Sequence, residues 1–258
     1  MVPPNRVLAK KGAPRAPMEK SNMSLRTLSI LVVLAGLVTA QAGSAKGTIT
    51  WEGKEPKNLL IQMDSDPVCK AESAGKEVRK QTTMVADGKL ANVIVYVSKG
   101  PAGWEKTGTA KTGAVSIDQK GCSYTPHVLA IQLGQKIEIK NSDKTTHNVH
   151  FQSKLNGDWN LTQSNEGVVP AAQEMKRAEI GTSSFKCDIH AWMEARVAIF
   201  EHPFFAVSAT DGTFSIDGLA PGAYTLTAWH EKEKSQDLEI TVAAGAAADA
   251  NFTFGKKK

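Results

Sequence analysis

Four residues in the second half of the chain have side chains that bind transition metals. Cys187, His190 and Met193 lie within one seven-residue stretch, and His147 precedes Cys187 by forty residues. A thiolate, two imidazoles and a thioether form the ligand set of an electron-transfer copper site, in which Cys and two His lie in a plane and Met binds weakly along the axis. The sequence therefore predicts a copper centre in which a short loop supplies three ligands and a distant strand supplies His147.

The other histidines lack this spacing. His150 lies three residues after His147, and side chains three apart on a strand point to opposite faces. We therefore expect His150 not to be a ligand. His127, His202 and His230 have no partner at a useful spacing, and we interpret them as surface or locally hydrogen-bonded imidazoles.

Around these residues the chain resembles a cupredoxin, and within that family it is most similar to amicyanin. The resemblance covers residues 114–201, about a third of the chain, and includes the short Cys-x-x-His-x-x-Met loop. The other similar segments are 117–120, 124–126, 131–139 and 147–151. The resemblance implies a Greek-key β-sandwich that holds one type 1 copper ion through His147, Cys187, His190 and Met193.

The resemblance also implies a role for the neighbours of the ligands. Asn148 would tie the His147 strand to the Cys187 segment, since hydrogen bonds of this kind orient metal ligands. Electrons would leave through an exposed edge of His190, with Trp192 beside it, towards a redox partner such as a c-type cytochrome or a periplasmic dehydrogenase.

Two positions in the loop depart from the family pattern. Ile189 and Ala191 stand where Pro is usual. Unlike Pro, Ile189 has a backbone N–H, which we predict donates to the Cys187 sulfur and raises the reduction potential. The alternative is that this N–H pairs with a carbonyl group.

Two cysteines remain if Cys187 binds copper. Cys69 and Cys122 are then predicted to form a disulfide, because exported proteins reside where disulfides persist. The alternative is a pair of free buried thiols.

The N-terminus reads as an export signal. Residues 28–40 form an apolar run too short to span a bilayer, Arg26 precedes it, and Ala40-Gln41-Ala42 is a small-x-small cleavage motif. We therefore interpret residues 1–42 as a signal peptide; the alternative is that translation begins at Met23, which would give a signal peptide of ordinary length. The expected location is periplasmic or secreted, with no membrane span in the mature chain.

Removing this segment changes the charge balance. The chain has 31 basic and 26 acidic residues, and residues 1–42 hold six of the basic residues and one acidic residue. The mature chain thus has 25 of each. Nucleic-acid binding is not expected, because it needs an excess of positive charge to neutralise phosphates.

Strand patterns dominate the rest of the sequence. Runs rich in β-branched residues, bounded by turn residues, indicate an all-β protein; they lie at 93–97, 136–139, 196–200 and 238–242. The one candidate helical turn is at 171–177.

A second module flanks the predicted copper domain. Residues 210–229, with Asp-Gly and Pro-Gly turn signals, resemble part of a carboxypeptidase regulatory-like, or transthyretin-like, β-sandwich. Strands of the type that opens such a module occur at 47–54 and 91–97. We therefore predict a sandwich split into halves 46–108 and 202–255, with the cupredoxin domain 113–201 inserted between them. The alternative is two tandem β-domains.

Together these features predict an exported blue copper protein that shuttles electrons and is not an enzyme. The alternative is a carbohydrate- or protein-binding β-sandwich with a structural copper site. Copper storage or delivery is less favoured, because the ligand set is complete for a tightly held ion. The motifs of serine hydrolases, phosphate-binding loops and multicopper oxidases are absent from the sequence.

Overall fold

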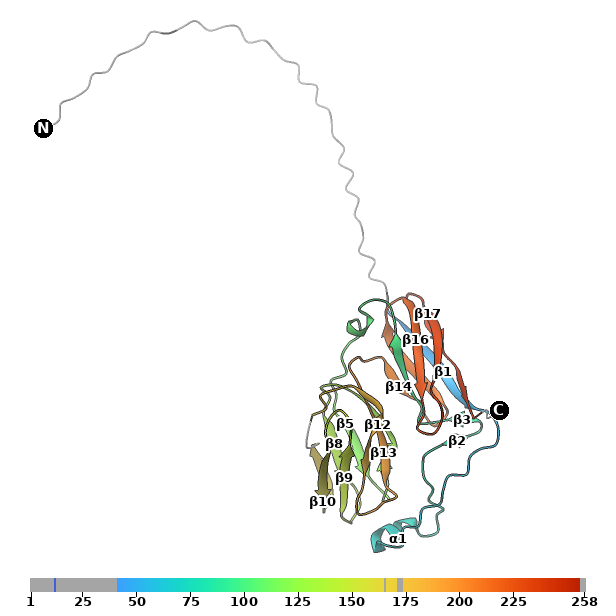
Figure 1. The fold of residues 1–258 in the computed structure, drawn as a ribbon, viewed down its shortest axis with the longest axis vertical. Coiled ribbons are helices and arrows are strands. Elements are labelled where there is room, and N and C mark those ends of the chain that lie inside the picture. Colours follow the sequence, from blue (N-terminus) through green and yellow to red (C-terminus); the bar gives the residue numbers. More distant parts are fainter. Residues whose placement is uncertain (1–11, 13–40, 165, 171–173, 256–258) are drawn as a thin grey trace, which may run out of the picture. The chain divides into compact units, whose positions relative to one another are not determined.

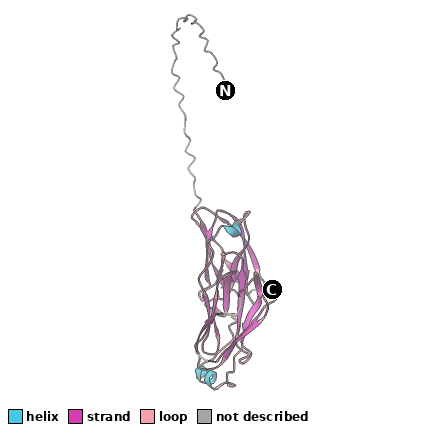
Figure 2. Cartoon of the chain, turned by 90° about the vertical axis from the view of Figure 1, so that its left-hand side faces the viewer, coloured by secondary structure: helices cyan, strands magenta, loops and turns pink. Residues whose placement is uncertain are grey.

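The computed structural model describes residues 12, 41–164, 166–170 and 174–255. The predicted signal peptide lies almost entirely outside these residues. Within the described part, strands dominate, and helix is limited to α1 (Pro67–Ser73) and the 3-10 turn η1 (Trp104–Lys106) (Figures 1 and 2). The prediction of an all-β protein is confirmed.

Two sheets enclose one hydrophobic core. The first has the order β15-β1-β3-β2, with β18 and β19 also pairing β1, and the second has the order β14-β4-β16-β17. Alternate residues of β15 and β16 point into this core, as expected for strands with one buried face. The strands are β1 (Gly43–Trp51), β2 (Val85–Ala86), β3 (Lys89–Leu90), β4 (Ile94–Lys99), β14 (Phe205–Val207), β15 (Thr213–Leu219), β16 (Gly222–Trp229), β17 (Gln236–Val242), β18 (Ala247–Asp249) and β19 (Phe252–Phe254).

Strands from opposite ends of the chain share these two sheets. β1 pairs antiparallel with β15, and β4 pairs antiparallel with β14 and β16. Each sheet therefore contains strands from both 46–108 and 202–255. The domain boundaries themselves remain a prediction.

The middle of the chain forms two further sheets around a second core. Their orders are β10-β9-β12-β13-β7 and β11-β8-β5-β6. The core contains the contacting rings of Phe151, Trp159 and Phe185. The strands are β5 (Val115–Gln119), β6 (Tyr124–Thr125), β7 (Val128–Gln132), β8 (Ile137–Asn141), β9 (His147–Gln152), β10 (Trp159–Gln163), β11 (Gly167–Pro170), β12 (Glu179–Lys186) and β13 (Glu194–Phe200).

Strand register brings the predicted ligands to one end of the first of these sheets. β9 and β12 run antiparallel, with His150 opposite Lys186. The start of β9 at His147 and the loop that follows Lys186 therefore lie at the same end. The loop 187–193 closes the antiparallel hairpin of β12 and β13, in which Lys186 pairs with Glu194.

An excursion between β1 and β2 contributes no strand to either sandwich sheet. We define residues 60–79 as the cap; its base is closed by a bridge between Leu60 and Arg79 and by a bond from the Ile61 N–H to the Val78 carbonyl. The cap contains helix α1, which the sequence analysis missed. The helix predicted at 171–177 is wrong for the described residues 174–177, which are not helical, and 171–173 lie outside the described residues.

The two cores are joined by a third apolar cluster. Ile94 of β4 and Phe205 of β14 pack with Val128 of β7 and with Ala198 and Phe200 of β13.

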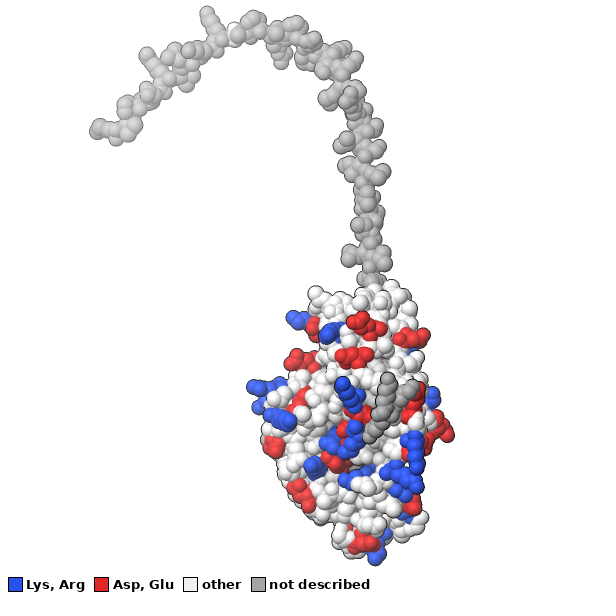
Figure 3. Space-filling model, turned by 45° about the vertical axis from the view of Figure 1, so that its right-hand side comes forward, with Lys and Arg blue, Asp and Glu red and all other residues white. Residues whose placement is uncertain are grey.

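In the described part of the chain, no helix is long and apolar enough to cross a bilayer. On the face drawn in Figure 3, basic and acidic side chains are interspersed.

Candidate metal centre

Three predicted ligand atoms converge in the interior. His147 Nδ1 lies 3.0 Å from His190 Nδ1, and Cys187 Sγ lies 3.7 Å from the same His190 nitrogen. The ligand atoms of these three residues all lie within 4.8 Å of one another. All three side chains are buried, at 0–3% exposure.

These separations fit a single bound metal ion. Metal–nitrogen bonds of about 2.1 Å and metal–sulfur bonds of about 2.3 Å, as at zinc, allow two donors on one ion to be up to about 4.4 Å apart. Both measured contacts are shorter than that. Two imidazoles with one thiolate, in a β-sandwich interior, match the in-plane donors of an electron-transfer copper site.

Met193 lies in the same hydrophobic core as Cys187 and is 2% exposed. Backbone bonds hold it in the ligand loop: its N–H donates to the His190 carbonyl, and its carbonyl accepts from the Cys187 N–H. The loop therefore closes on itself and keeps Cys187, His190 and Met193 as one unit at the end of the β12–β13 hairpin.

Asp143 holds the far edge of His147. Its Oδ2 lies 2.9 Å from His147 Nε2, so the Nδ1 atom faces the cluster. Asp143 also accepts the N–H groups of Gly121 and Cys122 at 2.7 and 2.8 Å. Those two residues have positive φ values of 62° and 53°, and successive N–H groups of such a turn converge on an anion.

The contact with Asp143 favours the protonated form of His147. Burial disfavours the charged imidazolium, but hydrogen bonds to Asp143 and Cys187 raise the pKa of His147 to about 9. Burial and the neighbouring charge of His147 lower the pKa of His190. A metal must therefore displace a proton from His147 at neutral pH, as expected when ligands must be deprotonated to bind.

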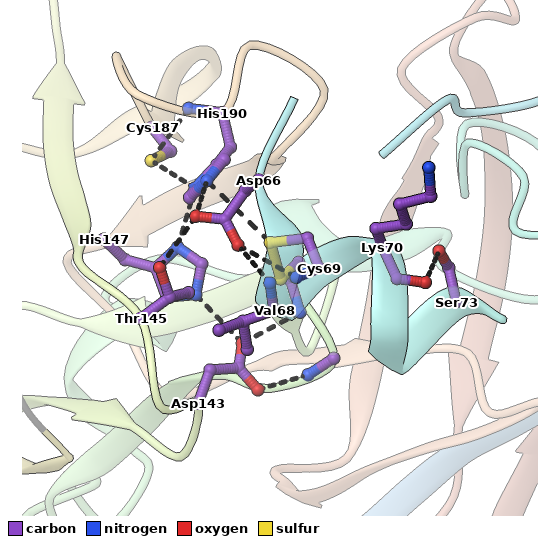
Figure 4. Close-up of a disulfide and its surroundings, with 12 residues drawn as sticks. Asp66, Val68, Cys69, Lys70, Ser73, Asp143, Thr145, His147, Cys187 and His190 are labelled. Atoms are coloured by element: carbon purple, nitrogen blue, oxygen red, sulfur yellow. Dashed lines mark hydrogen bonds and ion pairs between the residues drawn. A yellow bond between two sulfur atoms is a disulfide. The ribbon is translucent and has the colours of Figure 1, made fainter. Parts of the chain in front are cut away.

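His190 is not exposed, which corrects the expectation from the resemblance. It is 1% exposed, and the cap covers its outer edge, with Asp66 pointing towards it (Figure 4). Asp66 Oδ2 lies 3.5 Å from His190 Nε2. The disulfide between Cys69 of helix α1 and Cys122 runs beside the same ring, with Cys69 Sγ 3.8 Å from His190 Nε2.

Trp192, in the ligand loop, packs against the cap. Its ring centroid lies 5.0 Å from that of His190, and its Nε1 donates to the Cys122 carbonyl at 3.0 Å. It also packs against the small cluster of Met63, Cys69 and Cys122.

Asn148 connects the His147 strand to the Cys187 loop. Its Oδ1 accepts the Cys187 thiol at 3.3 Å and the N–H groups of Asp188 and Ile189 at 2.8 and 3.4 Å. The Ile189 N–H therefore bonds to a side-chain carbonyl, and it also acts on the Cys187 sulfur together with the His190 N–H, which donates to that sulfur at 3.4 Å.

The thiolate of Cys187 is favoured by these surroundings. Burial by itself raises the pKa of the thiol, but hydrogen bonds from His147 and from neighbouring backbone N–H groups more than offset this, so the pKa is lowered. The thiolate is the form that binds a metal.

The other histidines lie outside this cluster. His150 bonds through Nδ1 to Asp188 Oδ1 at 2.9 Å, and His127 bonds to the Glu194 carbonyl and to Glu231. His202 and His230 each accept a nearby backbone N–H through Nδ1. His127 and His230 are buried rather than on the surface.

Sequence reasoning missed the two carboxylates beside the ligands. Asp143 lies four residues before His147, a spacing that carries no ligand signal in a β-protein. Asp66 precedes Pro67, and Asp before Pro is a helix-start signal, but nothing in the sequence connects it with His190.

Comparison with known proteins gives two kinds of similarity. Residues 192–255 match the Carboxypeptidase regulatory-like domain family. Among solved structures, an amicyanin variant in its Cu(I) form is 21% identical, with a TM-score of 0.29 and coverage of 42% of this chain and 98% of the other. A purple cupredoxin from Nitrosopumilus maritimus is 16% identical, with a TM-score of 0.27 and coverage of 33% and 98%.

A copper-containing nitrite reductase from Thermus scotoductus SA-01 is 18% identical with a TM-score of 0.30; the similarity covers 34% of this chain and spans only 22% of the reductase. No curated protein matches the chain. The chain therefore contains a segment that matches the Carboxypeptidase regulatory-like domain family, and it is similar in structure to cupredoxins such as amicyanin.

Proposed function

We propose that this protein is an exported type 1 copper protein that carries single electrons between redox partners. The convergence of His147 Nδ1, His190 Nδ1 and Cys187 Sγ in a buried site is the observation that carries this proposal. Bound copper would supply a one-electron couple between Cu(II) and Cu(I), to which soft sulfur and imidazole ligands are suited.

The residues of this chain would keep the ligands in place through both oxidation states. Asn148 holds the Cys187 loop through the Asp188 and Ile189 N–H groups, and Asp143 holds the His147 ring. Partners that orient metal ligands in this way also tune the metal. A site held in one geometry needs little rearrangement when it gains or loses an electron.

Export rests on the predicted signal peptide at 1–42 and fits the disulfide between Cys69 and Cys122. The partner proposed is a c-type cytochrome or a periplasmic dehydrogenase. Since the cap closes the His190 edge, electron exchange is proposed to occur at Ile189 of the ligand loop, an apolar side chain that is 50% exposed.

The test is to load the protein with Cu(II) and record its visible spectrum during reduction and reoxidation. We expect an intense blue or purple charge-transfer band that requires Cys187, bleaches on reduction and returns on oxidation. Cys187→Ser should abolish the band, whereas His150→Ala should keep it, because His150 bonds to Asp188 outside the cluster. A colourless Cu(II) complex would contradict the proposal, and a coloured one that cannot be reduced reversibly would favour a structural copper in a binding module.

A further inference from the structure

The cap places a negative charge against a ligand that the cupredoxin resemblance predicted to be exposed. Asp66 is the only cap residue for which an ion pair with His190 is found among the described residues, with its Oδ2 3.5 Å from Nε2. The opposite ring nitrogen, Nδ1, faces His147 and Cys187. The carboxylate and the metal would therefore act on opposite edges of one imidazole (Figure 4).

Asp66 is held in this position by contacts that do not involve the ligand. Its Oδ1 accepts the N–H groups of Val68 and Cys69 at 2.8 and 2.9 Å and so caps helix α1. Its Oδ2 accepts the Thr145 hydroxyl at 2.9 Å. The side chain is therefore oriented from two sides before it meets His190.

The cap is itself fastened to the copper-site region. Cys69, on the first turn of α1, is bonded to Cys122, and the Cys122 N–H donates to Asp143, the partner of His147. Met63, Ile61 and Val78 pack with this disulfide and with Trp192. Asp66 and Asp143, the carboxylate partners of His190 and His147, are therefore connected through the disulfide between Cys69 and Cys122.

We propose that Asp66 is a positioning residue for the copper centre, which accepts the Nε2–H of His190 and lowers the reduction potential. A carboxylate that accepts the free N–H of a ligating imidazole increases the basicity of the ligand. A more basic ligand and a nearby negative charge both stabilise Cu(II) relative to Cu(I). The inference rests on the proposed function, because it assumes copper at the three-ligand cluster.

The test compares the reduction potentials of the copper-loaded wild-type protein, Asp66→Asn and Asp64→Asn. Asn is as good a helix N-cap as Asp, so Asp66→Asn keeps α1 through one oxygen that accepts the Val68 and Cys69 N–H groups, but it removes the charge and the second oxygen that faces His190. Asp64 lies in the same cap, is 66% exposed and pairs with Lys70, so Asp64→Asn is the matched control. An unchanged thermal unfolding temperature would show that the cap remains folded.

We expect Asp66→Asn to keep the charge-transfer band and to have a higher reduction potential. The ratio of Cu(II) to Cu(I) affinity should fall about tenfold, which corresponds to a rise in potential of about 59 mV for a one-electron couple. Asp64→Asn should leave the potential unchanged. A lower potential in Asp66→Asn than in the wild type would overturn the proposal. So would a ratio of Cu(II) to Cu(I) affinity that differs from the wild-type ratio by less than about twofold.

A second measurement reports on His190 directly. In the diamagnetic Cu(I) form, hydrogen exchange of the His190 ring N–H should be slow in the wild-type protein and at least about tenfold faster in Asp66→Asn, because the acceptor is lost. Equal exchange rates would contradict the contact. If wild-type protein with Cu(II) shows no intense band, the proposed function fails; if the band is present but Asp66→Asn behaves as wild type, only the role of Asp66 fails.

Discussion

At the scale of single residues, the centre is defined as much by the partners of the ligands as by the ligands. His147 and His190 present Nδ1 to the cluster because Nε2 of each ring faces a carboxylate, Asp143 or Asp66. One oxygen of Asn148, Oδ1, accepts hydrogen bonds from the Cys187 thiol and from the N–H groups of Asp188 and Ile189. These contacts restrict ring and loop rotation before any metal binds.

Asp143→Asn should weaken Cu(II) binding by about 10–100-fold, since outer partners of ligating histidines typically contribute that much. Asn cannot accept all three donors, because one side-chain oxygen becomes an N–H₂ group that faces N–H donors. The measurement is a competition titration with a Cu(II) chelator. Asp249→Asn, at an exposed position on β18, is the control, and equal affinities for the two variants would contradict the role of Asp143.

The Ile189 amide lies where both of its predicted partners, the Cys187 sulfur and a carbonyl group, are within reach. It bonds to Asn148 Oδ1, and it is one of the backbone N–H groups, with that of His190, that act on the Cys187 sulfur. The effect of Ile189 on the reduction potential stays a prediction, and its side chain, half exposed, contributes to the surface beside the predicted ligands.

At the scale of elements, the site depends on the register of β9, β12 and β13. The long connection from β9 to β12 must end with His150 opposite Lys186 for Cys187 to reach His147. A shift of one residue would move every side chain of the strand to the other face. Glu179, the first residue of β12, helps to hold this arrangement.

Glu179 anchors the turn between β9 and β10. It is 4% exposed and accepts the N–H groups of Lys154 and Leu155, the hydroxyls of Ser153 and Thr182, and the Asn156 side chain. Burial by itself would raise its pKa, but these bonds lower the pKa to about 2 from an ordinary 4.5. The ionised form therefore stabilises the fold.

Because the folded-state pKa is depressed, this stabilisation is present above pH 4.5 and is lost as the pH falls towards 2. A shift of this size corresponds to about 3 kcal/mol. Urea unfolding should show that Glu179→Gln is less stable than wild type at pH 7 and that the difference shrinks between pH 4.5 and 2. Glu239→Gln, exposed on β17, should follow the wild type; a difference for Glu179→Gln that does not depend on pH would contradict the assignment.

At the scale of the whole molecule, the two β-structures are joined by packed apolar residues and buried charge. The Phe200 ring stacks on Phe205 with centroids 4.4 Å apart and contacts Tyr96. Glu231, after β16, bonds to both His127 and Arg196. Loss of packing at this junction should therefore affect both parts.

Phe200→Ala should destabilise the protein by about 3–5 kcal/mol, the usual cost of removing a buried Phe. Phe200 is 1% exposed, whereas Leu59, the control, is 71% exposed, and Leu59→Ala should change stability by less than about 0.5 kcal/mol. Chemical unfolding followed by both tryptophan fluorescence and the copper band measures the effect. A loss below about 1 kcal/mol would show that the junction contributes little.

The sequence alone predicted the candidate ligands and the class of fold. The four ligand types, at a spacing that resembles that of amicyanin, predicted a copper site, and strands such as 93–97 and 238–242 show their period-2 or β-branched pattern locally. The pairing of Cys69 with Cys122 was predicted once Cys187 was assigned to copper, because only two cysteines then remain, and the structure contains this disulfide. These features depend on residues that are near one another or unique in the chain.

Only the tertiary structure decided how the site is enclosed. Helix α1 is seven residues long with one buried residue, so it has no apolar period to reveal it, and its packing on His190 comes from the fold of the whole chain. The burial of His190, the approach of Asp66 and the pairing of Glu231 with His127 join segments far apart in sequence. A residue's type and spacing carry no record of such neighbours, because the contacts arise from the packing of separate sheets and loops.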